Sequence, residues 1–207
     1  MRRLHIFASL TVLAAIATMI ALGLWQLDRR AEKAALLALY RANLTQPALA
    51  FPGQPPVPDA ALFRPSSLMC VKVTGWRTEA GRSAKGVSGY RWIADCRTAA
   101  SGPGALVDMG ITRNPTLRPN WAGGPVSGRI TSEPSHMSLL DRLGGKTEVL
   151  RPMLIATTPA PGLEASAPPS PDDVPNNHLA YAVQWFLFAG IAGIIYLIAL
   201  RRRMRAG

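Results

Sequence analysis

His178 is the residue of this sequence best suited to ligand chemistry. If the segment that follows it is helical, His178, Tyr181, Ala182 and Trp185 share one face, because they are offset by 3, 4 and 7 positions. An imidazole beside an apolar, aromatic wall could ligate the iron of a haem while the rings pack on the porphyrin. Aromatic residues and histidine also gather at membrane interfaces without binding any ligand, so an interfacial belt is the competing interpretation.

A second set of side chains, early in the chain, carries positive charge. Gln26, Arg29 and Lys33 share a helical face, and Trp25 lies one turn before Arg29. Such a basic row could receive haem propionates or lipid phosphates, since guanidinium groups pair with these anions. The residues alone favour the plainer interpretation, in which Trp25 and the charges fix the depth of a membrane helix.

The chain has two cysteines, Cys70 and Cys96, too few for a disulfide scaffold or a zinc site. A β-hairpin centred near residues 82–83 would place Cys70 opposite Cys96 and Thr74 opposite Trp92. Opposed residues at such positions have Cα atoms ~4.5 Å apart, which permits a disulfide in an exported domain. Two small buried hydrophobic side chains are the alternative, and a copper site is a weaker one.

Two long uncharged segments, residues 4–27 and 178–200, must position these side chains. Neither contains Asp, Glu, Lys or Arg, and each is long enough to cross a ~30 Å hydrocarbon layer as a helix. The first could instead be a cleaved signal peptide, but it lacks a good small-residue cleavage site. Much of the net charge of +11 comes from six arginines at the chain ends. Nucleic acid is therefore not predicted as a partner.

The same arginines predict the orientation in the membrane. Cytoplasmic flanks of membrane spans are enriched in Lys and Arg. We therefore expect both termini to be cytoplasmic and the central domain to be periplasmic. No Arg- and Ser-rich transit segment precedes the first span, which favours a multi-pass protein of the bacterial inner membrane. Small residues at four-residue spacing, Ala17 with Ala21 and Ala189 with Gly193, would allow the two spans to pack against each other or against a partner. The equally good alternative is that Ala and Gly are simply common in such helices.

The sequence between the spans divides by composition. Helix formers continue the first span outward to about residue 44, and two proline-rich stretches frame five short strand-like runs. The predicted class is a membrane α+β protein, with N- and C-terminal transmembrane helices flanking a small exported antiparallel β domain or partly closed barrel. The predicted boundaries are a transmembrane helix at 4–27, a Pro-rich linker at 45–62, the β-rich domain at 63–156, a second Pro-rich linker at 157–177, a transmembrane helix at 178–200 and a basic cytoplasmic tail at 201–207.

Catalytic signatures are missing from the sequence. It has no glycine-rich phosphate loop, no Gly-x-Ser-x-Gly elbow and no pair of histidines at metal-binding spacing. His5 and His178 lie at opposite ends of the predicted spans and cannot share one metal ion. His136 lies in a turn-like, solvated stretch. The sequence therefore predicts a protein that is not an enzyme, with His178 as its one candidate metal ligand.

Both ends of the sequence resemble the surfeit locus protein 1 family. The segments that carry the resemblance are Gly23-x-Trp25-Gln26-x-x-Arg29-Arg30-x-x-Lys33 and Asn177-His178-Leu179-x-Tyr181-x-x-x-Trp185-Phe186. The resemblance covers the ends well and the middle loosely. It implies an assembly factor for haem-copper cytochrome c oxidase that binds haem a and aids its insertion into the catalytic subunit. It also implies that His178 is the haem ligand.

The resemblance also suggests roles for the neighbouring residues and for partners. Tyr181 and Trp185 would shape the haem face, while Arg29 or Lys33, next to Trp25, would meet the propionates. The implied partners are the catalytic subunit of cytochrome c oxidase and the haem a synthesis machinery. The alternative function is a haem-independent membrane scaffold for the oxidase subunit.

Two departures from the family pattern accompany these expectations. Residues 107–111 read Val-Asp-Met-Gly-Ile where the family usually has Val-Asn-Arg-Gly-Trp. The region at 159–175 is mostly proline-rich and lacks the family's Trp-Asp segment. Contacts that those residues make in relatives are therefore not expected in this chain.

Overall fold

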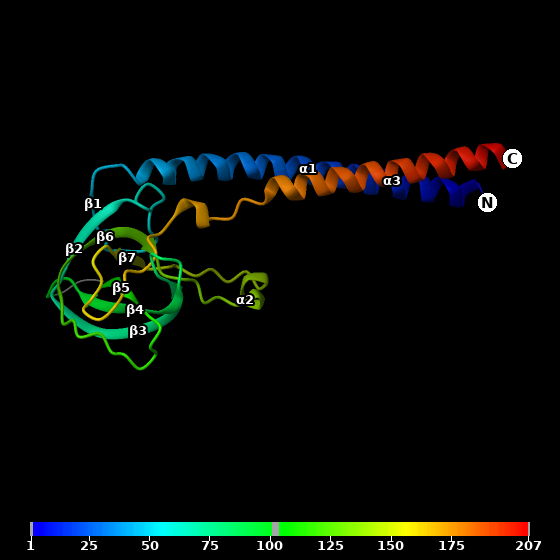
Figure 1. The fold of residues 1–207 in the computed structure, drawn as a ribbon. Coiled ribbons are helices and arrows are strands. Elements are labelled where there is room, and N and C mark those ends of the chain that lie inside the picture. Colours follow the sequence, from blue (N-terminus) through cyan, green and yellow to red (C-terminus); the bar gives the residue numbers. More distant parts are fainter. Residues whose placement is uncertain (1, 101–103, 207) are drawn as a thin grey trace. The chain divides into compact units, whose positions relative to one another are not determined.

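The computed structural model describes residues 2–100 and 104–206 (Figure 1). They form two compact units, one comprising the chain up to Leu36 together with the segment from Pro175 onward, the other running from Leu37 to Val174. The elements in chain order are α1 (Arg2–Asn43), β1 (Leu49–Ala50), β2 (Pro65–Cys70), β3 (Lys72–Arg82), β4 (Ser88–Arg97), β5 (Ala105–Thr112), β6 (Gly124–Ser132), α2 (Leu139–Leu143), β7 (Pro152–Ala156), the 3-10 helix η1 (Pro171–Asp173) and α3 (His178–Ala206).

The helical unit contains most of α1 and all of α3. Both helices are long and apolar enough to cross a membrane, as their uncharged sequences predict. Their buried and half-buried positions recur at alternating spacings of 3 and 4 residues, the period of a left-handed helix pair. These seam positions are Ser9, Val12, Ile16, Met19, Gly23 and Gln26 in α1, and His178, Ala182, Trp185, Ala189, Ala192 and Tyr196 in α3.

Small residues allow the close approach in this seam, but only some of the predicted ones. Ala189 is buried and Gly193 is half-buried, as their spacing predicts. Ala17 and Ala21 are exposed, so they do not pack against α3, and packing against a partner stays a prediction. The small residue that α1 places in the seam is the buried Gly23, because the 3-and-4 periodicity of α1 points the two alanines away from α3.

The β unit is built on one seven-stranded sheet with the order β1-β2-β6-β7-β5-β4-β3. A disulfide joins Cys70, at the end of β2, to Cys96 in β4, with 5.2 Å between their Cα atoms. In a flat sheet these second and sixth strands would lie roughly 19 Å apart. The sheet must therefore curl around its core into a partly closed barrel, as Figure 1 shows. This confirms the fold class, although the β1–β2 and β5–β7 pairings are parallel and make the sheet mixed.

The cysteine pairing is present, but the hairpin register that suggested it is wrong. Trp92 lies opposite Thr78 rather than Thr74, a shift of four residues. The strand expected to continue past Cys70 is interrupted there, because the chain exchanges β6 for β4 as its partner. The disulfide thus joins β2 to β4, which are not neighbours in the sheet and which approach each other where the barrel closes. It does not join two paired strands of a hairpin.

Apolar side chains fill both faces of the central strands. β5 and β7 are almost entirely buried, as expected for strands covered on both faces. The cluster on one face includes Trp92, Ala94, Val107, Ile130 and Leu154. The smaller cluster on the other face consists of Ile93, Leu106, Met153 and Ile155.

The two proline-rich segments, predicted as linkers at 45–62 and 157–177, are largely packed onto the β unit. The first contributes β1, which pairs with β2. The second buries Ala160 and Leu163 in the main core cluster. The prolines do favour extended backbone, but the apolar residues between them gain enough by burial to dock on the sheet.

A buried carboxylate, Asp108, lies in the middle of β5. Its Oδ1 accepts hydrogen bonds from the Ser166 hydroxyl at 2.7 Å and the Gly110 amide at 3.0 Å. Its Oδ2 faces the Arg91 guanidinium at 3.6 Å, and Arg91 also pairs with Glu79 at 2.8 Å. Burial raises the pKa of the Asp108 carboxyl, and the hydrogen bonds from Ser166 and Gly110 and the charge of Arg91 only partly offset this.

We expect Asp108→Asn to change how the stability of the β unit depends on pH. Because the pKa of Asp108 is raised in the fold, the folded state keeps its proton to a higher pH than the unfolded state, which loses it near pH ~4. The stabilising effect of the protonated form is full below that pH and is lost as the pH rises through the folded pKa. Asparagine is neutral at every pH, so the variant does not lose this stability as the pH rises. Between pH 4 and pH 8 its free energy of unfolding should therefore increase relative to that of wild type, by about 1.4 kcal/mol for each pH unit by which the fold raises the pKa of Asp108. Unfolding of the full chain at pH 4 and pH 8 measures this, and identical pH profiles would contradict it.

Candidate functional site

Site residues from the two ends of the sequence meet within the helical unit, where α3 begins. His178, the first residue of α3, forms a hydrogen bond with Gln26 of α1, with 2.7 Å between Nδ1 and Oε1. The two residues are 152 positions apart in the sequence, and both are half-buried. The helix pair therefore brings the two resembling segments to one place.

This hydrogen bond determines which ring nitrogen of the neutral His178 carries the proton. The carbonyl oxygen of Gln26 can only accept, so Nδ1 must be the protonated ring nitrogen. In the neutral imidazole the lone pair then resides on Nε2. Within the described part of the chain, Nε2 has no hydrogen-bond partner. The hydrogen bond to Gln26 thus orients His178 in the way that metal-ligating histidines commonly are oriented.

Close helix packing one turn away supports this contact. A Cβ atom added to Gly23 would lie 2.6 Å from Cε1 of Phe186, so the Phe186 ring rests directly on the α1 backbone. Ala182, one turn after His178, is completely buried. Larger side chains at either small residue would push the helices apart and lengthen the bond between Gln26 and His178.

The aromatic residues predicted to line the site differ in their burial: one lies between the helices and two are exposed. Trp185 is half-buried in the seam and meets Phe188 edge to face at 6.2 Å between ring centroids. Tyr181 and Trp25 are 52% and 49% exposed, respectively. Tyr181 therefore lies beside the His178 face rather than in it, and its ring is open to the surroundings of the helix pair.

Arg29 and Lys33, the basic residues of α1 in the site, make only weak ionic contacts within the chain. Arg29 pairs with Glu32 at 2.7 Å and lies over the Trp25 ring at 5.7 Å from the centroid. More than half of each charged side chain in this pair is exposed. An exposed ion pair of this kind contributes little, so Arg29 can exchange Glu32 for an incoming anion. Lys33, on the same helical face as Gln26, is half-buried and has no ion pair with any described residue.

The family of this chain follows from a match to a family model. The model of the SURF1 family matches residues 13–190, which include α1 from residue 13 onward, all of the β unit and the first part of α3 with His178. The chain belongs to the SURF1 family. Members of this family, the surfeit locus protein 1 family that the two end segments resemble, are cytochrome oxidase assembly factors. No curated protein matches the chain.

The site residues of this SURF1 chain include the donor types that a haem requires. Among the described residues, no group of three His, Cys, Asp or Glu side chains could hold a metal. A porphyrin supplies its own equatorial nitrogens and needs from the protein one axial ligand, apolar packing and cations for its propionates. His178 Nε2, the exposed rings and Arg29 with Lys33 provide these donor types.

Gln26 is the site residue whose role the SURF1 sequence alone does not reveal. The sequence places it on the basic face with Arg29 and Lys33, without a partner. Its contact with His178 depends on the relative register of two helices, which no spacing within either helix encodes. The available signal is its position next to Trp25 in the segment that resembles the family.

Proposed function

We propose that this chain binds haem a through His178 and aids its insertion into the catalytic subunit of cytochrome c oxidase. The observation that carries the proposal is the hydrogen bond from His178 Nδ1 to Gln26, which leaves the Nε2 lone pair for an axial bond to iron. The haem supplies the redox-active iron when bound. The chain would bind it, orient it and release it, with no catalytic step of its own.

The neighbouring side chains would hold the rest of the macrocycle. Tyr181 and Trp185 offer rings for contact with the porphyrin face, and Trp25 offers a further ring on α1. Arg29 and Lys33 would meet the propionates, since an arginine pairs bidentately with a carboxylate. All are residues of the helical unit, so the proposed site does not depend on where the β unit lies.

The membrane arrangement that goes with this function places both termini in the cytoplasm and the β unit in the periplasm of a bacterial inner membrane. Arginines lie next to the end of each predicted span that is nearer a chain terminus. By the positive-inside rule these ends face the cytoplasm. The disulfide between Cys70 and Cys96 also supports an oxidising compartment for the β unit. The proposed partners are the oxidase catalytic subunit and the haem a synthesis machinery.

A second candidate function, a haem-independent scaffold for the oxidase subunit, is favoured by a different feature. Leu139, Leu140 and Leu143 of α2 are 77%, 80% and 83% exposed, respectively. Exposed leucines on one short helix are typical of a protein docking surface. Such a surface would hold the subunit whether or not haem is bound.

Gln26→Leu should weaken haem binding without abolishing it. Leucine has a similar size but cannot accept the Nδ1 proton, so His178 would lose its orienting contact. Loss of a residue that orients a ligating histidine costs about tenfold or more in affinity. Haem titration of the purified variant measures this, with Gln184→Leu, an exposed glutamine on α3, as the matched control. Equal affinities in wild type and Gln26→Leu would contradict the proposed role.

The proposed function is tested on the wild-type protein in cells that lack their own copy. The full chain is expressed with and without the enzymes that make haem a, and both the haem a content of the purified protein and the assembly of oxidase are measured. We expect the protein to copurify with haem a when it is made, and oxidase to assemble fully only then. Full oxidase assembly by a protein that never contains haem would overturn the carrier function and support the scaffold.

A further inference from the structure

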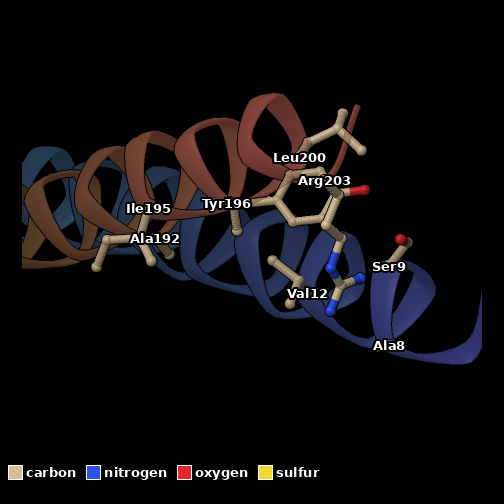
Figure 2. A pocket seen from close by; sticks show the side chains of 9 residues that line it. Ala8, Ser9, Val12, Ala192, Ile195, Tyr196, Leu200 and Arg203 are labelled. Atoms are coloured by element: carbon tan, nitrogen blue, oxygen red, sulfur yellow. The ribbon is translucent and has the colours of Figure 1, made fainter. Parts of the chain in front are cut away.

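A groove lies between α1 and α3 at the end of the helix pair opposite to His178. It has a volume of about 410 Å³ and is open to one side. Ser9 and Val12 line it from α1, and Ile195, Tyr196 and Leu200 line it from α3. Figure 2 shows the Arg203 side chain reaching from α3 toward α1 at the end of this groove.

The groove is apolar along its length and positively charged at one end. Alanine, valine, isoleucine and leucine side chains form its walls. The polar groups are the Ser9 and Tyr196 hydroxyls and the Arg203 guanidinium, and none of the lining residues is acidic. A ligand that fits this pattern has a long apolar part and an anionic end.

The surroundings of Arg203 increase the positive charge. Arg201, Arg202 and Arg205 neighbour it in the sequence at the end of α3, and Arg2 and Arg3 are the first residues of α1. Basic pockets between transmembrane helices commonly bind the head groups of anionic lipids. The helix pair thus has a lipid-sized apolar groove that leads into a cluster of arginines.

We propose that this groove binds an anionic phospholipid. One acyl chain lies between α1 and α3, and the phosphate accepts hydrogen bonds from Arg203, whose planar guanidinium can pair with two phosphate oxygens. A transmembrane helix of another protein fits less well, because its apolar surface offers no anionic group to the guanidinium that lines the end of the groove. The lipid would hold the ends of α1 and α3 together, far from the proposed haem site and independent of it.

The proposal is tested by native mass spectrometry of the full-length protein in detergent, with equal amounts of phosphatidylglycerol and phosphatidylcholine of the same acyl chains. Wild type should retain one phosphatidylglycerol, preferred over phosphatidylcholine about fivefold, since one basic residue near the head group contributes roughly that factor. Arg203→Ala should reduce the preference to about one. Ala199→Phe, which fills the groove, should lower binding of both lipids.

Two matched controls make the outcome decisive. Arg205→Ala removes the same charge from a residue that does not line the groove, and Ala15→Phe adds the same volume at an exposed position of α1. Ala15→Phe should bind both lipids as wild type does. Arg205→Ala should keep most of the preference for phosphatidylglycerol, since Arg205 adds to the surrounding charge but does not line the groove. An equal loss of preference in Arg205→Ala and Arg203→Ala would mean diffuse attraction to a basic surface and would overturn the site. Unchanged lipid binding in Ala199→Phe, or a protein dimer in place of the lipid adduct, would overturn it as well.

Discussion

Full-length protein carrying His178→Ala should purify with about a tenth or less of the haem that wild type retains. The reason is that Nε2 of His178 is the proposed axial ligand, and alanine leaves the iron without a bond to the chain. The helices should still pair, since the buried Ala182 and the contact between Gly23 and Phe186 do not involve His178. The haem-to-protein ratio from the absorption spectrum measures the effect, and far-UV circular dichroism checks that both helices are intact.

The matched control for this variant is His136→Ala. His136 lies in the β unit, where its side chain is largely exposed and its Nε2 is 3.3 Å from Glu79. The His136→Ala protein should therefore retain the full wild-type haem content. A His178→Ala protein with wild-type haem content would rule out His178 as the ligand and leave the scaffold as the better account.

Removing the disulfide should destabilise the β unit by about 3 to 4 kcal/mol. Cys70 and Cys96 are separated by 26 positions, and closing a loop of that length in the unfolded chain accounts for this magnitude. The bond also ties β2 to β4, the strands at which the curled sheet closes, so its loss should loosen the barrel first at that place. The measurement is chemical unfolding of the Cys70→Ala, Cys96→Ala double variant, followed by tryptophan fluorescence.

Reduction of the wild-type protein provides the internal control for the double variant. A reducing agent should lower the stability of wild type toward that of the double variant and leave the variant itself unchanged. If reduction has no effect on wild type while the variant is destabilised, then the cost comes from the lost side-chain packing of two buried residues and not from the covalent link.

Features that depend on short-range pattern were predictable from the sequence. The absence of charge over two long segments predicts the helices α1 and α3, and the 3-and-4 offsets after His178 predict that it shares a face with Trp185. The strand-like runs predict the β unit and, with two cysteines in an exported domain, a possible disulfide. These properties follow from local hydropathy and backbone preference, which the residues themselves encode.

Features that depend on long-range register were not predictable in the same way. The pairing of Trp92 is four residues away from the expected one because the hairpin of β3 and β4 turns between Arg82 and Ser88 and is not centred at 82–83. Cys70 lies outside that hairpin, because the chain changes strand partners after it. The proline-rich segment that buries Leu163 looked like a linker because proline content reports backbone shape and not where apolar neighbours dock. The hydrogen bond between Gln26 and His178 requires the relative rotation of two helices.

The most direct test of the central claim is the absorption spectrum of His178→Gly purified from haem a-producing cells with and without added imidazole. Free imidazole can occupy the space of the missing side chain and replace its axial nitrogen. We expect the haem spectrum to be lost in the variant and restored by imidazole, while wild type is unaffected. A variant that keeps the wild-type spectrum without imidazole would show that the iron is bound by another residue.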